Sequence, residues 1–463
     1  MVEQLNDLMK ALEAGSYNAA PGQLAQGASL QVEDLSPVME NVTFDDRAIK
    51  LQKMLSVKDA KSTLIQYNRQ LDYGVFGGSA QFEGGIGEED TSDYVRAIVP
   101  MSYYSTTRRV SVASNMIAAF DGRKAEDRAA ADAAMKLAAD IEFDSFRGQN
   151  EFSNGGVFDG NPGVIADMPN LIGVDQQVRM SDSLSNTQDL MFAEYGSDQT
   201  VVISVNGTLT QSDIEDSAVK SAMQHGSADK LLLDPISLAA YNKITHAKER
   251  IMLAGSAQDA TGANLRTQWT ASALVSLEPS RFLSGKTRPA RARSGSPSAP
   301  ATVTAAVAAD ASSVLTAGTY WYKATAVNER GESVATSITS AVSPTAGQKV
   351  TLTIAAVSGA KYHNVYRSGD GGTAASAKFI GRIKAAGSGS SSFVDLGNRE
   401  PGSVTGFLIE GKTMGLHQLA PYSRLKLAVS DLSLPEAHFR FLALAVYQPR
   451  KNVLLENIEG QLA

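Results

Sequence analysis

The side chains that most often carry chemistry are scarce in this chain of 463 residues. There are five histidines and no cysteine, which excludes disulfides, cysteine metal sites, iron–sulfur clusters and thiol catalysis. His246 and Glu249 lie three residues apart on a predicted helix and could reach one metal ion. A single pair does not make a site, so a solvated helix surface is the better interpretation. The remaining histidines show no metal-ligand spacing: His225, His363, His417 and His438.

Recognisable catalytic motifs are also absent from the sequence. No Gly-x-Ser-x-Gly elbow, Walker loop or dinucleotide fingerprint occurs. The glycine-rich stretch from Gly74 to Gly87 lacks a following Gly-Lys-Ser/Thr, and the acidic Glu88, Glu89 and Asp90 would repel phosphate. Two carboxylates brought together by folding could still act as a general acid and base, and the sequence leaves this alternative open. We therefore expect no enzyme, no catalytic, cofactor-binding or metal residues, and no cofactor.

Charge and hydropathy narrow the class of protein further. Lys and Arg number 42 against 49 Asp and Glu, so the net charge is −7, which disfavours a dedicated nucleic-acid binder. No apolar run reaches the roughly 18 residues of a membrane span. The first ten residues lack the basic start and apolar core of a signal peptide. A folded protein without a membrane span is expected.

The first part of the chain predicts elements with little core of their own. Residues 1–61 resemble an extended arm, although a loosely held terminus fits equally well. Residues 62–113 predict two strands around the glycine-rich centre, with a bendable tip. Residues 121–147 are rich in alanine, the best helix former, and predict a long helix that ends at Gly148.

The rest of the chain contains two regions whose apolar residues follow different spacings. Residues 150–285 predict an α/β region with buried strands at Val201–Val205 and Leu231–Leu233, and a helix from Ser237 to about Leu253. Basic residues between 285 and 300 interleave with Gly and Pro, which favours a linker over a contact with phosphate or an acidic partner. Residues 297–402 then alternate polar and apolar side chains between turns, the pattern of a β-sandwich.

Two resemblances follow from particular strings. The run Tyr322–Ser333, with Val365-Tyr366-Arg367-Ser368, resembles fibronectin type III and other immunoglobulin-like modules. The run Asp229–Tyr241 and the tail from His417-Gln418-Leu419-Ala420-Pro421 to Glu456-Asn457-Ile458, taken with the order of elements, resemble the major capsid protein of tailed bacteriophages (Caudoviricetes), the Hong Kong 97 phage fold. The sandwich departs from the minimal fold of that family.

The capsid resemblance implies an α+β fold with an inserted all-β sandwich. Its parts would be an N-terminal arm at 1–61, an extended loop at 62–113, a spine helix and peripheral domain at 114–149, an axial domain at 150–296, the inserted immunoglobulin-like sandwich at 297–402, and a return to the axial and peripheral core at 403–463.

The same resemblance implies a structural function and partners. The chain would self-assemble into hexamers and pentamers of an icosahedral shell around double-stranded DNA, in a virion assembled in the host cytoplasm. Portal, scaffold and decoration proteins would be partners, and the sandwich would project outward to stabilise the capsid or attach to host-surface glycans. Predicted contacts between subunits are Glu83, Glu88, Glu89, Asp90, Tyr94, Arg96, Arg108 and Arg109. Alternatives are an encapsulin-like cargo shell, or a hydrolase or adhesin carrying a sandwich.

Overall fold

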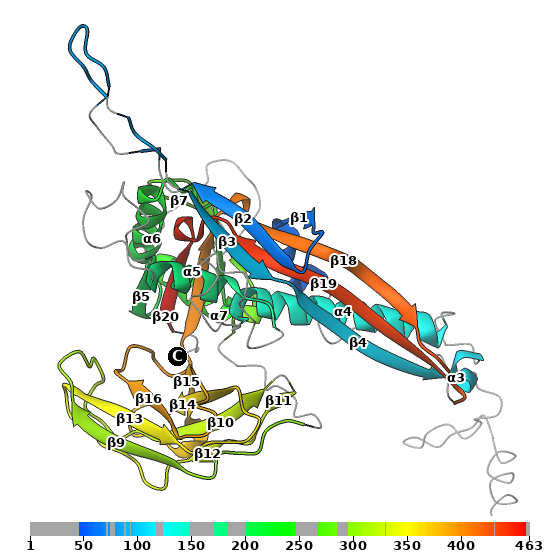
Figure 1. The fold of residues 1–463 in the computed structure, drawn as a ribbon. Helices are drawn as coiled ribbons and strands as arrows, with labels where there is room; N and C mark the ends of the chain where they lie inside the picture. The colour runs from blue at the N-terminus through cyan, green and yellow to red at the C-terminus, as the bar shows by residue number, and fades with distance from the viewer. Residues whose placement is uncertain are drawn as a thin grey trace, which may run out of the picture.

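The structure is a computed structural model that describes residues 46–70, 73–74, 79–87, 89–92, 94–116, 124–148, 170–183, 201–246, 267–284, 295–328, 330–429 and 431–459. It is mixed α+β (Figure 1). The predicted arm up to residue 45, Glu88 and the linker residues 285–294 lie outside the described residues. Within the described residues no helix is long and apolar enough to cross a membrane.

A four-stranded sheet forms the long part of the molecule. Its order is β1-β18-β19-β4, with β1 parallel to β18 and the other pairs antiparallel. Helix α4 packs along β4 and β19. Figure 1 shows the strands and α4 running together to an end occupied by α3. The bounds are β1 Ser56–Asp59, β4 Ser102–Ser111, β18 Met414–Lys426, β19 Ser433–Val446, α3 Val112–Met116 and α4 Ala125–Arg147.

Helix α4 matches the predicted alanine-rich helix. Leu137 and Ile141 are buried, and so is the carboxylate of Glu142. Glu142 accepts main-chain hydrogen bonds from Lys50, Leu51 and Gln52, at 2.9, 2.6 and 3.1 Å, which fixes the short helix α2 (Leu51–Met54) beside α4. Gly148 ends α4 without a left-handed backbone; a Cβ there would lie 1.9 Å from the Leu171 carbonyl oxygen.

A six-stranded sheet of order β5-β20-β17-β6-β8-β7 forms the second layer. Helix α5 shares one apolar core with it, and α6 and α7 share another, so the sheet is covered on both faces. The bounds are β5 Val202–Gly207, β6 Lys230–Leu233, β7 Thr267–Trp269, β8 Leu274–Pro279, β17 Val404–Ile409, β20 Val453–Ile458, α5 Val174–Ser183, α6 Gln211–Met223 and α7 Pro235–His246.

The sequence predictions for this sheet have mixed outcomes. Leu231–Leu233 is buried, as expected. The strand predicted as buried at Val201–Val205 is β5, whose apolar residues Val202, Ile203 and Val205 are only half-buried because β5 lies at the edge of the sheet. Thr210 caps α6 with a reciprocal bond to Asp213. Helix α7 begins at Pro235, before the predicted Ser237, because Pro suits a first helical turn.

A β-rich region lies in sequence between β8 and β17, which both pair with β6. It contains two sheets, β11-β10-β14-β15 with β12 beside β10, and β16-β13-β9, and one apolar core draws on both. Every strand pair in it is antiparallel. The bounds are β9 Val303–Ala309, β10 Tyr322–Asn328, β11 Gly331–Glu332, β12 Thr336–Ser337, β13 Gln348–Ile354, β14 Tyr362–Arg367, β15 Lys378–Lys384 and β16 Ser391–Asp395.

The predicted excursion at 62–113 is shorter in the structure. Strands β2 (Leu64–Gln70) and β3 (Tyr94–Pro100) form a separate two-stranded sheet in antiparallel register. Strand β4 instead pairs with β19, from Ser102 against Leu442 to Ser111 against Ser433. Residues 102–111 thus belong to the long sheet, since alternation along a strand does not reveal its partner.

Candidate assembly surfaces

The β2–β3 pair is anchored at its base. Ile65 and Val99 belong to an apolar cluster with Ala443 and Ala445 of β19. The Tyr67 hydroxyl donates a 3.0 Å hydrogen bond to the Val446 carbonyl. Beyond this base, residues 79–87 and 89–92 reach away from the body in Figure 1. The base is thus held by the chain's own core, while the far end is not.

The far end of the excursion exposes large apolar side chains. Phe82 is 96% exposed and Ile86 is 92% exposed. Tyr73 and Tyr94 are exposed as well, and we call these four residues the tip cluster. Isolated exposed apolar residues are ordinary, but four on one thin element indicate a contact with another molecule.

The predicted acidic contacts lie on the same element. Glu83, Glu89 and Asp90 are exposed, whereas Glu88 lies outside the described residues. Asp90 passes close to Gly74, where a Cβ would lie 2.1 Å from a carboxylate oxygen and where φ is +109°. The positive φ therefore favours glycine at residue 74, while the exposed Asp90 side chain could move aside. Arg96, also exposed, donates through Nε to Asn68 across the β2–β3 pair at 3.2 Å.

The predicted basic contacts lie elsewhere, on β4. Arg109 is exposed and forms a 3.0 Å ion pair with Asp431. Arg108 is half-buried and lies opposite Glu436 of β19. Among the described residues, neither arginine forms an ion pair with Glu83, Glu89 or Asp90 of the same chain, so a contact between these groups would need two chains.

A second exposed apolar group lies at the α3 end of the long sheet. Leu432 is 86% exposed and Met116 is 81% exposed. The Val112 N–H donates to the Leu432 carbonyl, which joins α3 to this end. With these two residues the distal patch comprises Leu425, Leu427 and Val429. The patch was not predicted from the sequence, although Leu425, Leu427 and Val429 alternate with other residues as on one face of a strand.

A charged network stiffens the sheet near the distal patch. Arg424 Nε donates a 2.5 Å hydrogen bond to the buried carboxylate of Glu436, and its guanidinium also pairs with Glu126 of α4. Lys426 contacts Glu126 at 3.1 Å. Hydrogen bonding with Glu436 and Lys426 lowers the pKa of Glu126. The network ties α4 to β18 and β19 near the distal patch.

The histidines form no catalytic arrangement in the described part of the chain. His438 is buried, its Nδ1 lies 2.9 Å from the Tyr422 hydroxyl, and burial lowers its pKa. His417 Nε2 lies 2.8 Å from the Tyr447 hydroxyl, and burial lowers its pKa too. No group of three or more metal-ligating side chains occurs among the described residues. Each of these two histidines therefore contacts a tyrosine of a neighbouring part of the long sheet and packs within the fold.

Comparison with known proteins gives structural neighbours only. No protein-family model matches the chain, and no curated protein matches its sequence. The capsid of a native GTA particle is 10% identical with a TM-score of 0.49, covering 96% of this chain and 100% of that chain. The capsid of the cyanophage P-SCSP1u is 9% identical with a TM-score of 0.44, covering 94% and 96%. The SrpI encapsulin of Synechococcus elongatus PCC 7942 is 10% identical with a TM-score of 0.35, covering 92% and 93%.

These neighbours include phage capsid proteins, at low identity.

Proposed function

We propose that the chain is the structural major capsid protein of a tailed bacteriophage. Many copies would assemble as hexamers and pentamers into a closed icosahedral shell around double-stranded DNA. The protein would act by forming contacts and not by catalysing a reaction. Its place would be the virion, after assembly in the host cytoplasm, with portal, scaffold and decoration proteins as further partners.

One observation carries this proposal: both ends of the elongated molecule expose large apolar side chains. Figure 1 shows residues 79–87 at one end of the molecule and α3 at the other. The first segment carries Phe82 and Ile86 of the tip cluster, and the distal patch lies beside α3. Different surfaces at opposite ends favour head-to-tail contacts, which close into rings when the rotation permits. A tip cluster that docks on the distal patch of a neighbour would bury both.

Charge supports the same pairing. Glu83, Glu89 and Asp90 lie beside the tip cluster, and Arg109 lies beside the distal patch, paired with Asp431, the residue before Leu432. Opposite charges around two apolar contacts fix their register and speed their encounter. Arg108 and Arg109 of one subunit would thus face the acidic tip of another.

The β-rich region would be an inserted sandwich of the fibronectin type III or immunoglobulin-like kind. It has its own apolar core, and it begins and ends between strands that pair with β6. A module with its own core does not need the shell to fold. We infer that it projects from the outer surface and stabilises the capsid or binds host-surface glycans.

Particle contents would separate a phage capsid from a cargo shell. Particles isolated from their source and treated with nuclease should retain double-stranded DNA. Particles that hold a protein cargo and no DNA would favour the encapsulin-like alternative. A single chain of 48.9 kDa under all conditions would contradict both.

A further inference from the structure

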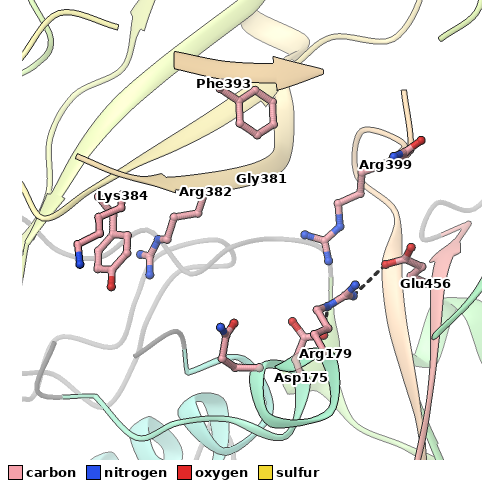
Figure 2. A pocket seen from close by; sticks show the side chains of 11 residues that line it. Asp175, Arg179, Gly381, Arg382, Lys384, Phe393, Arg399 and Glu456 are labelled. Carbon is pink, nitrogen blue, oxygen red and sulfur yellow. Dashed lines mark hydrogen bonds and ion pairs between the residues drawn. The ribbon is translucent and has the colours of Figure 1, made fainter. Parts of the chain in front are cut away.

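A cavity of about 400 Å³ lies between the six-stranded sheet with its helix α5 and the β-rich region (Figure 2). One wall comes from α5, β20 and the residues that follow β16; the other comes from β14, β15 and β16. This volume is within the range of sites that hold small ligands, roughly 300–1,000 Å³. We call it the interdomain cleft.

The two carboxylates that line the cleft are already paired. Arg179 donates to Asp175 at 2.9 Å and contacts Glu456 at 2.9 Å. Figure 2 marks the contacts that join Arg179 to Asp175 and to Glu456. One arginine thus lies between two acids, and the remaining charges of the lining are positive.

Three further cations line the cleft from both walls. Arg382 and Lys384 come from β15, and Arg399 comes from the opposite wall. Among the described residues no acceptor hydrogen bonds the Arg399 guanidinium, whose main-chain carbonyl accepts from Arg367 at 2.7 Å. Burial lowers the pKa of Arg399, and the nearby charge of Arg179 lowers it too, against the opposing effect of Asp175. The described lining of the cleft therefore carries more positive than negative side chains.

Hydrogen bonding and ring packing hold the side chains of the β-rich wall in place. Arg382 Nε donates to Asn364 Oδ1 at 2.9 Å, and its guanidinium lies 5.0 Å from the centre of the Tyr362 ring. The Phe393 ring packs against Gly381, where a Cβ would lie 2.9 Å from the ring. A guanidinium held in one orientation beside an aromatic ring suits a small anion that carries phosphate or carboxylate groups.

We propose that the interdomain cleft binds a small oxyanion with at least two charged groups, held by Arg399 on one wall and by Arg382 and Lys384 on the other. Phosphate and carboxylate share this chemistry. A ligand that contacts both walls would hold the β-rich region on the rest of the chain. The inference goes beyond the shell role and does not depend on it.

Binding can be measured by calorimetry on the full-length protein in chloride buffer. Inorganic pyrophosphate is one probe and citrate is the other. We expect saturable binding of one anion per chain, weakened about tenfold by Arg399→Gln and by Arg382→Gln, because each removes a charge-assisted hydrogen bond. Lys243→Gln is the control: it removes the same charge from an exposed position on α7, across the six-stranded sheet from α5.

Binding of pyrophosphate alone would assign a phosphate ligand, and binding of citrate alone would assign a carboxylate ligand. Binding of both would indicate recognition by charge. In the absence of anion Arg399→Gln should melt no lower than the unaltered protein, since it removes a charge that burial disfavours. Three results would overturn the proposal. The Arg399→Gln variant could melt at a lower temperature, the variants could bind both probes as tightly as the unaltered protein, or the unaltered protein could bind neither probe.

Discussion

The Tyr104 hydroxyl donates a 2.7 Å hydrogen bond to the Asp144 carboxylate and accepts one of 3.0 Å from the Leu171 N–H. The contact joins β4 of the long sheet to α4, and both to the segment that leads into α5. Burial raises the pKa of Asp144 to about 6, while the bond from Tyr104 acts in the opposite direction. A single hydroxyl therefore couples three elements.

This contact predicts a pH dependence of stability. A carboxyl whose pKa is higher in the folded state binds its proton more tightly when folded, so the free energy of unfolding should fall as pH rises from about 4 to about 6. The fall attributable to Asp144 should be at most about 3 kcal/mol, with no further change above pH 6. Urea unfolding of the unassembled protein at pH 4 to 7 measures it. Asp144→Asn should flatten the slope, whereas Asp132→Asn, at an exposed position of the same helix, should not. An unchanged slope in Asp144→Asn would count against the assignment.

The hydroxyl itself should matter more than the ring. Tyr104→Phe leaves Asp144 and the Leu171 N–H each without one partner, and should lower the free energy of unfolding by about 1–3 kcal/mol. Tyr103→Phe is the matched control, since Tyr103 is half exposed and its ring packs on Phe441, a contact that Phe retains. Equal losses in the two variants would show that the Tyr104 bonds contribute nothing specific.

The Arg424–Glu436 pair should behave as a buried ion pair. Arg424→Met leaves the buried Glu436 carboxylate without its cation and should cost about 3–5 kcal/mol of stability. Adding Glu436→Gln should restore much of that loss. Lys426→Met removes an exposed partner of Glu126 and should cost less than about 1 kcal/mol. Chemical denaturation of all four proteins, the double variant included, tests this, and a double variant no more stable than Arg424→Met would refute it.

The tip cluster should be needed for assembly and not for folding. Phe82→Ser with Ile86→Ser should leave the melting temperature of the chain unchanged but prevent particle formation, because each side chain stabilises a contact by about 1.5–3 kcal/mol when buried. Val334→Ser removes an apolar residue of the β-rich region that is also highly exposed, at 81%, and this variant should assemble normally. Sedimentation velocity separates particles from single chains, and normal particles from the double variant would argue against the tip cluster as a contact.

A mixing experiment tests whether the tip cluster docks on the distal patch. Leu432→Ser with Met116→Ser should also prevent assembly. A mixture of this protein with the tip variant retains one intact tip and one intact patch, on different chains, so it should form dimers and nothing larger. Single chains only, or dimers from either protein alone, would mean that the two surfaces are not partners.

Charge reversal tests the acidic part of the same contact. Glu88→Lys with Glu89→Lys should slow or prevent assembly at low salt if these residues face Arg108 and Arg109 of a neighbour. Arg109→Glu in the same chain should partly restore it. Particles that form at the normal rate from the Glu88 and Glu89 variant would refute the pairing.

Removal of the β-rich region tests its independence. A chain in which a short Gly-Ser linker replaces 297–402 should still assemble, because the region has its own core and its neighbours in sequence pair within another sheet. Electron microscopy shows the particles. Failure to assemble, with a normal melting temperature, would indicate that the region clamps adjacent subunits.

The sequence pattern predicted the positions of helices and strands better than it predicted which strands pair with each other. Alanine content located α4, and the apolar run at Leu231–Leu233 located a buried strand, because both signals depend on neighbouring residues. The partner of β4 could not be read, since alternation is the same in a hairpin and in a larger sheet. The cleft was missed because Arg179, Arg382 and Arg399 meet only through the fold. Within the tip cluster only Tyr94 was among the predicted contacts. Tyr73, Phe82 and Ile86 were not predicted, because their exposure depends on the fold and not on neighbouring residues in the sequence.

The central claim is that many copies of this chain close into a shell. Negative-stain electron microscopy of the purified protein tests it most directly. The account predicts hollow particles of uniform diameter, lost in the Phe82 and Ile86 double variant and retained in Val334→Ser. A field of separate chains at every concentration and salt, without closed particles, would contradict it.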